Sequence, residues 1–357
     1  MAQKVLPKIY FTKYFNEENI RRLFLIMLNE LKEINKGISD NDVIAVKTHF
    51  GEKGNTRFVK PELIKPITDE IKKISSELNC NCFITDSNTL YRGQRLNAKD
   101  HVKLAKEHGF DVLGIPIIIA DGMYGDEEVD VEINKNIFDN GKIAKKIYEA
   151  DVMVLISHFK GHMLFGFGGA IKNLGMGCSS RAGKLKMHSK IAPYVKSEKC
   201  TGCEVCIKNC AVDAISLKNG KAMINNDKCT GCAKCISVCP QGIIMIPWHG
   251  ATSNEVQERC AEHAFGAVKN KKLICINFIN NITKDCDCLK DSEIIGNDIG
   301  IVASLDPVAC DKASYDLVKE KHGKDIFIEH NNVDGTHILD YAEEISLGVK
   351  EYELIGI

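Results

Sequence analysis

Two runs of cysteine dominate the chemistry that this sequence can support. Of its 16 cysteines, four stand in KCTGCEVCIKNC (199–210) and four in KCTGCAKCISVC (228–239). Both runs have the spacing C-x2-C-x2-C-x3-C, which places three thiolates on one tight loop whose amides point toward the sulfurs. Such a loop can hold three iron corners of a cuboidal iron–sulfur cluster, and the fourth ligand must come from elsewhere. The alternative is zinc, which four cysteines can bind tetrahedrally.

These runs resemble the bacterial-type two-cluster ferredoxins, and the resemblance covers residues 193–248. Gly202, Gly231 and Pro240 stand where that family places them, whereas Ala211 replaces the proline that usually follows the fourth cysteine. In that family the fourth cysteine of each run serves the other cluster. The resemblance therefore implies two 4Fe-4S clusters with crossed ligand sets, which are Cys200, Cys203, Cys206 and Cys239 for the first and Cys229, Cys232, Cys235 and Cys210 for the second.

The repeat also predicts a function. Two clusters built from shared cysteine runs lie close together, which suits the transfer of single electrons between partners. The resemblance implies a low reduction potential and redox enzymes of anaerobic metabolism as electron donors or acceptors. Residues 196–248 carry seven lysines against four acidic residues, whereas small ferredoxins of this kind are acidic, so the partners should differ from theirs. We expect a ferredoxin-like electron carrier in the cytoplasm of an anaerobic organism.

A second cysteine motif, DCDC, occupies residues 285–288. Cysteines one residue apart can share a metal ion, and several histidines stand at predicted strand ends or beside turns. Strand ends are where open α/β sheets place their sites. The sequence therefore offers residues that could form an additional metal or substrate site together, namely Cys286, Cys288, Cys178, His188, His158 and His162. The alternative is that the loop thiols are solvated and the histidines are structural.

Two glycine-containing loops give weaker signals. GFGGAIKN (166–173) could present backbone amides at a helix N-terminus to an anion, with Lys172 nearby. THFGEKGN (48–55) places His49, Glu52 and Lys53 after a strand, where a solvated turn is the simpler interpretation. Neither loop has the G-x-x-x-x-G-K-[ST] or G-x-G-x-x-G spacing, so the sequence predicts neither ATP nor a dinucleotide as ligand.

Outside the cysteine repeat, β-branched runs alternate with amphipathic ones, which is typical of helices around a mostly parallel sheet. We predict strands over 42–50, 81–87, 151–159, 272–280, 299–305 and 352–357, and helices over 16–35, 61–78, 97–108, 307–319 and 338–347. The sequence therefore predicts an α/β domain made of residues 1–192 and 249–357. A small α+β ferredoxin-like module, residues 193–248, is inserted into a surface loop of it, where insertions cost little. Two adjacent domains joined by this module are the alternative.

The larger domain is similar to the family known as domain of unknown function 362. The segments that carry this resemblance are VKTHFGEKGN (46–55), ISHFKGHMLFGFGGAIKNLGMGC (156–178), KLKMHSK (184–190), DCDC (285–288) and IVASLDPVACDKASYDLV (301–318). The resemblance implies an architecture in which an inserted ferredoxin-like module is familiar. It implies no established activity.

Charge and hydropathy argue against two classes of partner. The chain has 47 basic and 48 acidic residues and no arginine-rich stretch, so we expect no nucleic acid. No run approaches the roughly 20 apolar residues of a membrane-spanning helix, and the first residues do not read as a secretory signal. The oligomeric state has no signature in the sequence.

Two other functions fit the same residues. In a reductase, the clusters would feed a metal or substrate site of the α/β domain near Cys286, Cys288, Cys178 and His188. A metal-delivery protein would expose labile thiols. A carrier should hold two clusters and show no turnover of its own, whereas a reductase should bind an additional metal or a small molecule.

Overall fold

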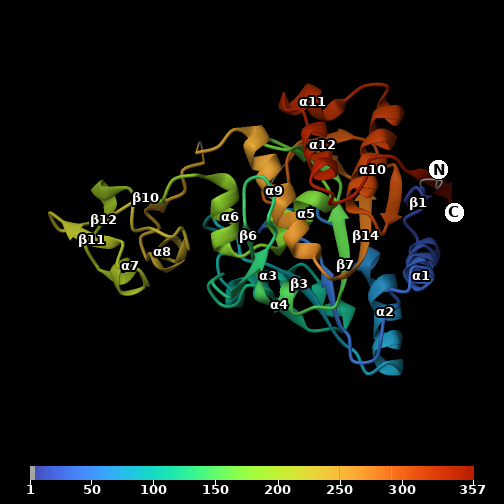
Figure 1. Ribbon diagram of the computed structural model, residues 1–357, viewed down its shortest axis with the longest axis horizontal. Coiled ribbons are helices and arrows are strands. Elements are labelled where there is room, and N and C mark those ends of the chain that lie inside the picture. Colours follow the sequence, from blue (N-terminus) through green and yellow to red (C-terminus); the bar gives the residue numbers. More distant parts are fainter. Residues whose placement is uncertain (1–4, 249, 291) are drawn as a thin grey trace.

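The computed structural model describes residues 5–248, 250–290 and 292–357, and its largest element is an eight-stranded sheet (Figure 1). The strands lie in the order β18–β1–β17–β14–β7–β2–β3–β4. Within this sheet only β17 runs antiparallel to its neighbours, so the predicted α/β fold with a mostly parallel sheet is confirmed. The strands are β1 (Lys8–Thr12), β2 (Val43–Lys47), β3 (Asn81–Asp86), β4 (Ile117–Ile119), β7 (Val152–His158), β14 (Lys272–Ile279), β17 (Gly300–Ser304) and β18 (Glu353–Gly356).

Helices bury both faces of the sheet. Successive residues of a strand point in opposite directions, so Val154 of β7 packs into one apolar layer and Leu155 into the other. Burial of both faces is expected for a mostly parallel sheet. The first layer contains α1 (Glu17–Glu33), α2 (Pro61–Glu77) and α3 (Ala98–Glu107), and the second contains α5 (Ala170–Cys178), α9 (Ser253–Val268), α10 (Pro307–His322) and α12 (Thr336–Glu344).

Several helices begin at capping residues that the sequence supplies. Asn97 accepts the N–H of Asp100 at the start of α3, and Thr252 forms a capping box with Glu255 at the start of α9. These side chains satisfy N–H groups that the first turn leaves unpaired. The helix predicted over 61–78 begins at Pro61, a position where proline forfeits no hydrogen bond. Within the described residues, no helix combines the length and the apolar composition that crossing a membrane requires.

Shorter elements fill the connections of the α/β body. The hairpin of β8 and β9 follows β7 directly and begins at the end of that strand. The remaining short elements are η1 (Phe110–Leu113), β5 (Glu128–Glu132), β6 (Asn140–Ala144), α4 (Lys145–Tyr148), β8 (Lys160–His162), β9 (Gly166–Gly168), α6 (Arg181–His188), β15 (Ile282–Thr283), β16 (Ile294–Gly296) and α11 (Ile326–Asn331).

Residues 193–248 form an extension that projects from one end of the α/β body, drawn in yellow tones in Figure 1. Its helices α7 and α8 begin 29 residues apart, which matches the period of the sequence repeat. Ile215, Ile236 and Ile244 form a small core, which Leu90 and Leu185 of the body complete. The elements of the extension are β10 (Tyr194–Val195), η2 (Ser197–Lys199), α7 (Val205–Lys208), β11 (Ile215–Lys218), β12 (Lys221–Ile224), α8 (Lys234–Val238) and β13 (Ile244–Met245).

A buried carboxylate joins α10 to α5. Asp311 accepts the N–H groups of Ala170 and Ile171 at 2.6 and 2.8 Å, and the side-chain amide of Asn277 at 2.7 Å. Gly169 permits this approach, because a Cβ there would lie 2.2 Å from Asp311 Oδ1. The N-terminus of α5, which the sequence offered to an external anion, is therefore occupied by the protein's own carboxylate, and that expectation is wrong.

Replacing Asp311 with alanine should lower the free energy of unfolding by about 3 kcal/mol, because several hydrogen bonds of roughly 1 kcal/mol each are lost and their buried donors stay unpaired. Urea-induced loss of far-UV circular dichroism, recorded without oxygen, measures this change. The control is Asp340→Ala, which removes an exposed ion pair with Lys350 and should have almost no effect. Equal stability of the two variants would contradict the role of Asp311.

Candidate functional site

A cavity of about 480 Å³ lies at the carboxyl ends of β2, β3 and β7. Lys47, Asp86 and His158, the last residues of these strands, all line it. Open α/β sheets bind their ligands at this edge. Most residues of the additional site predicted from the sequence also line the cavity, namely Cys286, Cys288, His158, His162 and His188.

Cys178 lies apart from this cavity. It is buried at the end of α5, where its sulfur lies 3.9 Å from Met153 Sδ and burial raises the pKa of the thiol to about 11. Among the described residues that line this cavity, no three histidine, cysteine or acidic side chains converge closely enough to hold a metal ion. The other residues of the predicted additional site therefore line the cavity, whereas Cys178 does not. A metal ion at this site remains a prediction.

The DCDC loop is held in place by its central residue. Asp287 is buried and accepts from His158 Nδ1 at 2.8 Å, with Lys160 at 3.4 Å, and its backbone carbonyl accepts the N–H of Glu52. Although burial opposes ionisation, the His158 and Lys160 cations hold the pKa of Asp287 below its ordinary value. His158 Nε2 faces the carbonyl of Asn280 at 2.8 Å. Both nitrogens of His158 therefore donate, and neither is free to ligate a metal.

Cys288 lies among hydrogen-bond donors. Arg95 Nη2 is 3.3 Å from its sulfur and His49 Nε2 is 3.5 Å from it. The neighbouring Cys286 thiol, Arg95 and His49 together hold the pKa of Cys288 well below its ordinary value, although burial opposes this. The neighbouring Cys288 raises the pKa of Cys286. The surroundings thus favour a thiolate at Cys288 and a thiol at Cys286.

The orientation of His49 supports the thiolate. The N–H of Gly51 donates to His49 Nδ1 at 2.9 Å, which assigns the ring hydrogen to Nε2. Arg95 Nη1 lies 2.8 Å from the same Nε2, so two donors face each other there. A thiolate at Cys288 offsets the repulsion between these two donors, because its negative sulfur accepts hydrogen bonds from both Arg95 and His49.

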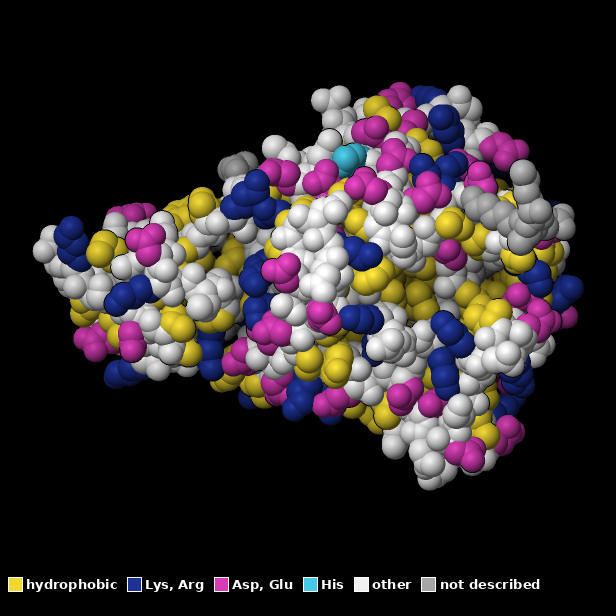
Figure 2. All heavy atoms as spheres, viewed as in Figure 1, with side chains coloured by type: hydrophobic (Ala, Val, Ile, Leu, Met, Phe, Trp, Pro, Cys, Tyr) yellow, Lys and Arg dark blue, Asp and Glu magenta, His cyan; other side chains and the backbone are white. Residues whose placement is uncertain are grey.

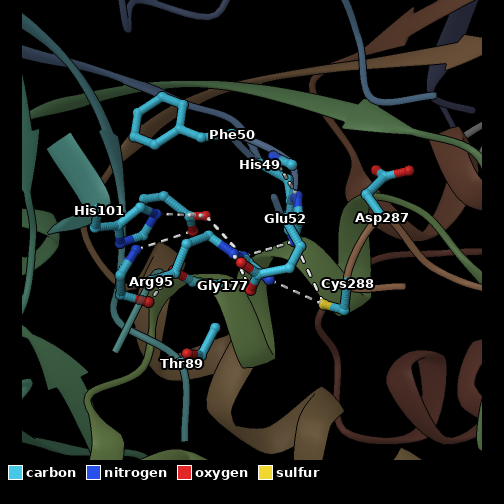
Figure 3. Close-up of polar contacts among 12 residues, drawn as sticks. His49, Phe50, Glu52, Thr89, Arg95, His101, Gly177, Asp287 and Cys288 are labelled. Atoms are coloured by element: carbon cyan, nitrogen blue, oxygen red, sulfur yellow. Dashed lines mark hydrogen bonds and ion pairs between the residues drawn. The ribbon is translucent and has the colours of Figure 1, made fainter. Parts of the chain in front are cut away.

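Arg95 connects the loops around the cavity (Figure 3). Its side chain is almost completely buried, with Nε 3.3 Å from Glu52 and Nη1 3.6 Å from Asp86. Its Nη2 donates to the Tyr91 hydroxyl as well as to the Cys288 sulfur. One guanidinium therefore fixes the positions of four acceptors from different segments.

The other two cavity histidines are neutral. His162 Nδ1 accepts the N–H of Leu164 at 3.0 Å, and burial lowers the pKa of His162. His188 packs edge-on against Trp248 with ring centroids 4.9 Å apart, and burial lowers its pKa to about 4. His188 Nδ1 has no hydrogen-bond partner within the described part of the chain. This buried nitrogen is therefore available to a ligand in the cavity.

Lysines give the cavity a positive lining. Lys47 pairs with Asp86 at 3.0 Å. Burial lowers the pKa of Lys184 to about 8, so it remains mostly cationic at neutral pH. Lys172 makes no ion pair with any described residue and lies over the Phe165 ring at 5.6 Å, so its charge can still pair with a ligand. Lysine and arginine side chains outnumber carboxylates in the lining, which favours a small anion.

The repeat cysteines surround two small cavities in the extension. One is lined by Cys200, Cys203, Cys206 and Cys239, and the other by Cys210, Cys229, Cys232 and Cys235. Each group takes three cysteines from one run and the fourth from the other. The N–H of Ala222 donates to Cys200 Sγ at 3.4 Å and that of Ala214 to Cys210 Sγ at 3.2 Å, and such hydrogen bonds tune cluster sulfurs. These donor sets fit two 4Fe-4S clusters, whose binding stays a prediction.

The loop after β3 connects the extension to the main cavity. Leu90 and Tyr91 pack against the core of the extension, which contains Cys239, and both residues also line the cavity. Arg92 Nη2 lies 3.4 Å from the carbonyl oxygen of Cys239. The Tyr91 hydroxyl and the Cys288 sulfur both accept from Arg95 Nη2. This one loop therefore spans from the repeat cysteines to the DCDC thiolate.

Several residues of this site lack a local sequence signal. Lys53 is exposed, as the solvated-turn interpretation requires, but His49 and Glu52 turn inward toward Arg95, so that interpretation is wrong for them. Arg95 and Tyr91 stand in no motif. Their partners come from segments far apart in the chain, and only the folded sheet brings these together.

The thiolate predicts selective alkylation. At pH 6.5 iodoacetamide should modify Cys288 about tenfold faster than Cys286, because the thiolate is the nucleophile. Arg95→Met should raise the pKa of Cys288 and slow its reaction at this pH about tenfold for each unit of pKa change. Peptide mass spectrometry of timed samples measures both rates.

Arg92→Met, at an exposed arginine of the same loop, is the control and should leave the alkylation rate unchanged. The buried Cys178, with its raised pKa, should stay unmodified throughout. Equal rates at Cys286 and Cys288 in the unaltered protein would show that the charge is not held at Cys288.

Comparisons with known proteins give distant structural matches. No curated protein matches the chain. The lactate racemase apoprotein from Thermoanaerobacterium thermosaccharolyticum gives a TM-score of 0.36 at 14% identity, over 78% of this chain and 51% of that one. A protein from Thermotoga maritima gives a TM-score of 0.40 at 10% identity, over 87% of this chain and 59% of that one. The chain thus spans somewhat over half the length of these structures, and likenesses this distant carry no argument about function.

The family comparison covers most of the chain. The model described as "Domain of unknown function (DUF362)" matches residues 44–316. This range begins in β2, includes the loop of His49, the extension and the DCDC motif, and ends within α10. The carboxyl ends of all three strands that form the main cavity lie inside it. The chain therefore belongs to the DUF362 family.

Proposed function

We propose that this chain is an iron–sulfur electron-transfer protein that serves a reaction site in its own α/β domain. The eight repeat cysteines hold two 4Fe-4S clusters, which supply single electrons when bound. The two four-cysteine cavities, with their amide hydrogen bonds to sulfur, support this ligand assignment. The protein is then a reductase or oxidase unit and not solely a soluble electron carrier.

The loop of Leu90, Tyr91 and Arg92 is the observation that carries this proposal. Arg92 contacts the carbonyl of Cys239, a predicted ligand of the first cluster, and Tyr91 accepts from the same Arg95 nitrogen that donates to the Cys288 sulfur. A pure carrier needs no continuous contact between its clusters and a buried polar cavity. Here that contact is short and consists of adjacent residues, which favours electron transfer between the extension and the cavity.

The cavity favours a small anionic substrate. Its volume of about 480 Å³ is in the range typical of small-molecule sites. Lys172 offers a charge that is not ion-paired with any described residue, and the neutral His188 offers an unpaired nitrogen. A carboxylate or a similar anion satisfies both groups.

Electron exchange with external proteins is the second candidate function. Cys203 and Cys232 are exposed, so each predicted cluster approaches the surface of the extension. Lysines are visible on that surface (Figure 2), and residues 196–248 carry seven of them against four acidic residues. A redox partner with an acidic docking face fits this charge. The same surface could also load the clusters in the reductase.

The crossed ligand sets predict reciprocal effects of two substitutions. Anaerobically purified protein should contain about eight iron and eight sulfide per chain. Cys210→Ser should perturb the cluster held by Cys229, Cys232 and Cys235, whereas Cys239→Ser should perturb the one held by Cys200, Cys203 and Cys206. Paramagnetic resonance after chemical reduction distinguishes the two signals. If each substitution disturbed the cluster encoded in its own run, the crossed assignment would be wrong, and stoichiometric zinc without iron would overturn the function.

If electrons pass to the cavity, a change of charge in the cavity should shift the reduction potential of the nearer cluster. Alkylating Cys288 with iodoacetamide removes a negative charge, which should raise the reduction potential of the cluster held by Cys239, since the reduced form is the more negative one. A redox titration followed by paramagnetic resonance measures this shift. The cluster held by Cys210 is the internal control and should shift less. No shift at either cluster would favour the external carrier role.

A further inference from the structure

Cys286 and Cys288 are placed to react with each other. Asp287 alone separates them, and both cysteines line the same cavity. The buried Asp287 and its contacts with His158 and Glu52 hold the loop in one arrangement. A disulfide needs its sulfurs about 2.05 Å apart. The two thiols can reach this separation by side-chain rotation and a small adjustment of the loop.

The surroundings give the two sulfurs different roles. Arg95 and His49 donate to Cys288, which stabilises a negative sulfur as attacking or leaving group. The neighbouring Cys288 raises the pKa of Cys286, which is therefore the protonated member of the pair. Both cysteines are partly exposed and line the cavity, so a small molecule can reach them.

We infer that Cys286 and Cys288 are a redox couple that alternates between dithiol and disulfide and acts on a small anionic disulfide bound in the cavity. The Cys288 thiolate attacks the bound disulfide and releases one half as a thiolate. Cys286 then loses its proton and attacks the Cys288 sulfur, which releases the second half. The substrate leaves as one thiol and one thiolate, and the protein keeps a Cys286–Cys288 disulfide.

Resetting the couple requires two electrons, and in this respect the inference rests on the proposed function. Breaking the Cys286–Cys288 bond takes up two electrons and one proton, which regenerates the Cys286 thiol and the Cys288 thiolate. The eight repeat cysteines would hold two 4Fe-4S clusters, which would supply these two electrons, one from each. Tyr91 packs against the core that contains Cys239 and shares the Arg95 donor with Cys288, which places it on the route that these electrons take.

A reductive titration tests the couple. Anaerobic holoprotein is first oxidised with diamide, and after removal of the reagent, peptide mass spectrometry should find a 286–288 disulfide. Reduced methyl viologen is then added in measured amounts while paramagnetic resonance follows the clusters. At equilibrium the oxidised protein should consume two more electrons per chain than Cys286→Ser or Cys288→Ser. Far-UV circular dichroism verifies the fold of both variants, and either variant alone suffices for the comparison.

The chain contains a matched control in its other C-x-C pair. Cys80 and Cys82 flank Asn81 at the start of β3, away from the cavity, and Cys80 Sγ donates to the carbonyl of Ser39. The double variant Cys80→Ser, Cys82→Ser should keep the two additional electrons. If this variant lost them and Cys286→Ser kept them, the redox couple would be the wrong pair.

The substrate class has its own probe. The disulfide 3,3′-dithiodipropionate is anionic, and cystamine is a cationic disulfide of similar size. The anionic disulfide should oxidise the Cys286–Cys288 pair at least tenfold faster, and Lys172→Ala should reduce this preference. Equal rates, or faster oxidation by cystamine, would overturn the anionic substrate.

Failure of this inference can be told apart from failure of the proposed function. Protein that lacks both clusters would refute the function, even if a 286–288 disulfide formed. Protein with two reducible clusters but no 286–288 disulfide, or with zinc bound to the pair, would refute the redox couple and leave the function intact. A disulfide that viologen reduces equally fast in Cys239→Ser would show that the nearer cluster is not its electron donor.

Discussion

The buried guanidinium of Arg95 is the interaction on which the rest of the site depends. A cation removed from water is stable only among anions and acceptors, and those around Arg95 come from separate segments. Glu52 follows β2, Asp86 ends β3, and Cys288 belongs to the loop after β14 and β15. Three strand ends are thereby held against one side chain. The negative charge on Cys288 is part of the compensation for the burial of Arg95.

Much of the fold could be predicted from the sequence because strands buried on both faces are continuous apolar runs. Every predicted strand lies in the central sheet. The strands of this sheet that the pattern missed are the edge strand β4, only three residues long, and β1, whose polar ends obscure its apolar residues. The grouping of the repeat cysteines could be anticipated because their spacing is local and repeated. Whether they hold iron remains a prediction.

The site was predictable only where a motif is contiguous. The DCDC motif identifies two thiols, but no neighbouring residue in the sequence indicates which of them is ionised. That depends on Arg95 and His49, which lie 193 and 239 residues away in the sequence. The glycine-rich start of α5 has the form of an anion site, yet its amides are bonded to Asp311, 141 residues from Ala170. Sequence patterns identify available donors, whereas their partners depend on the tertiary fold.

The extension leaves and re-enters the α/β body at one place. A Cβ on Gly250 would lie 2.2 Å from Ser189 Oγ, so the two connecting segments touch. Trp248, the one tryptophan of the sequence, stands at this junction, lines the cavity and packs edge-on against His188. The indole fluorescence of the protein therefore originates from a single position, between the extension and the cavity that small molecules would enter. Trp248 is thus an intrinsic fluorescent probe of this junction, and its use requires neither a label nor an engineered residue.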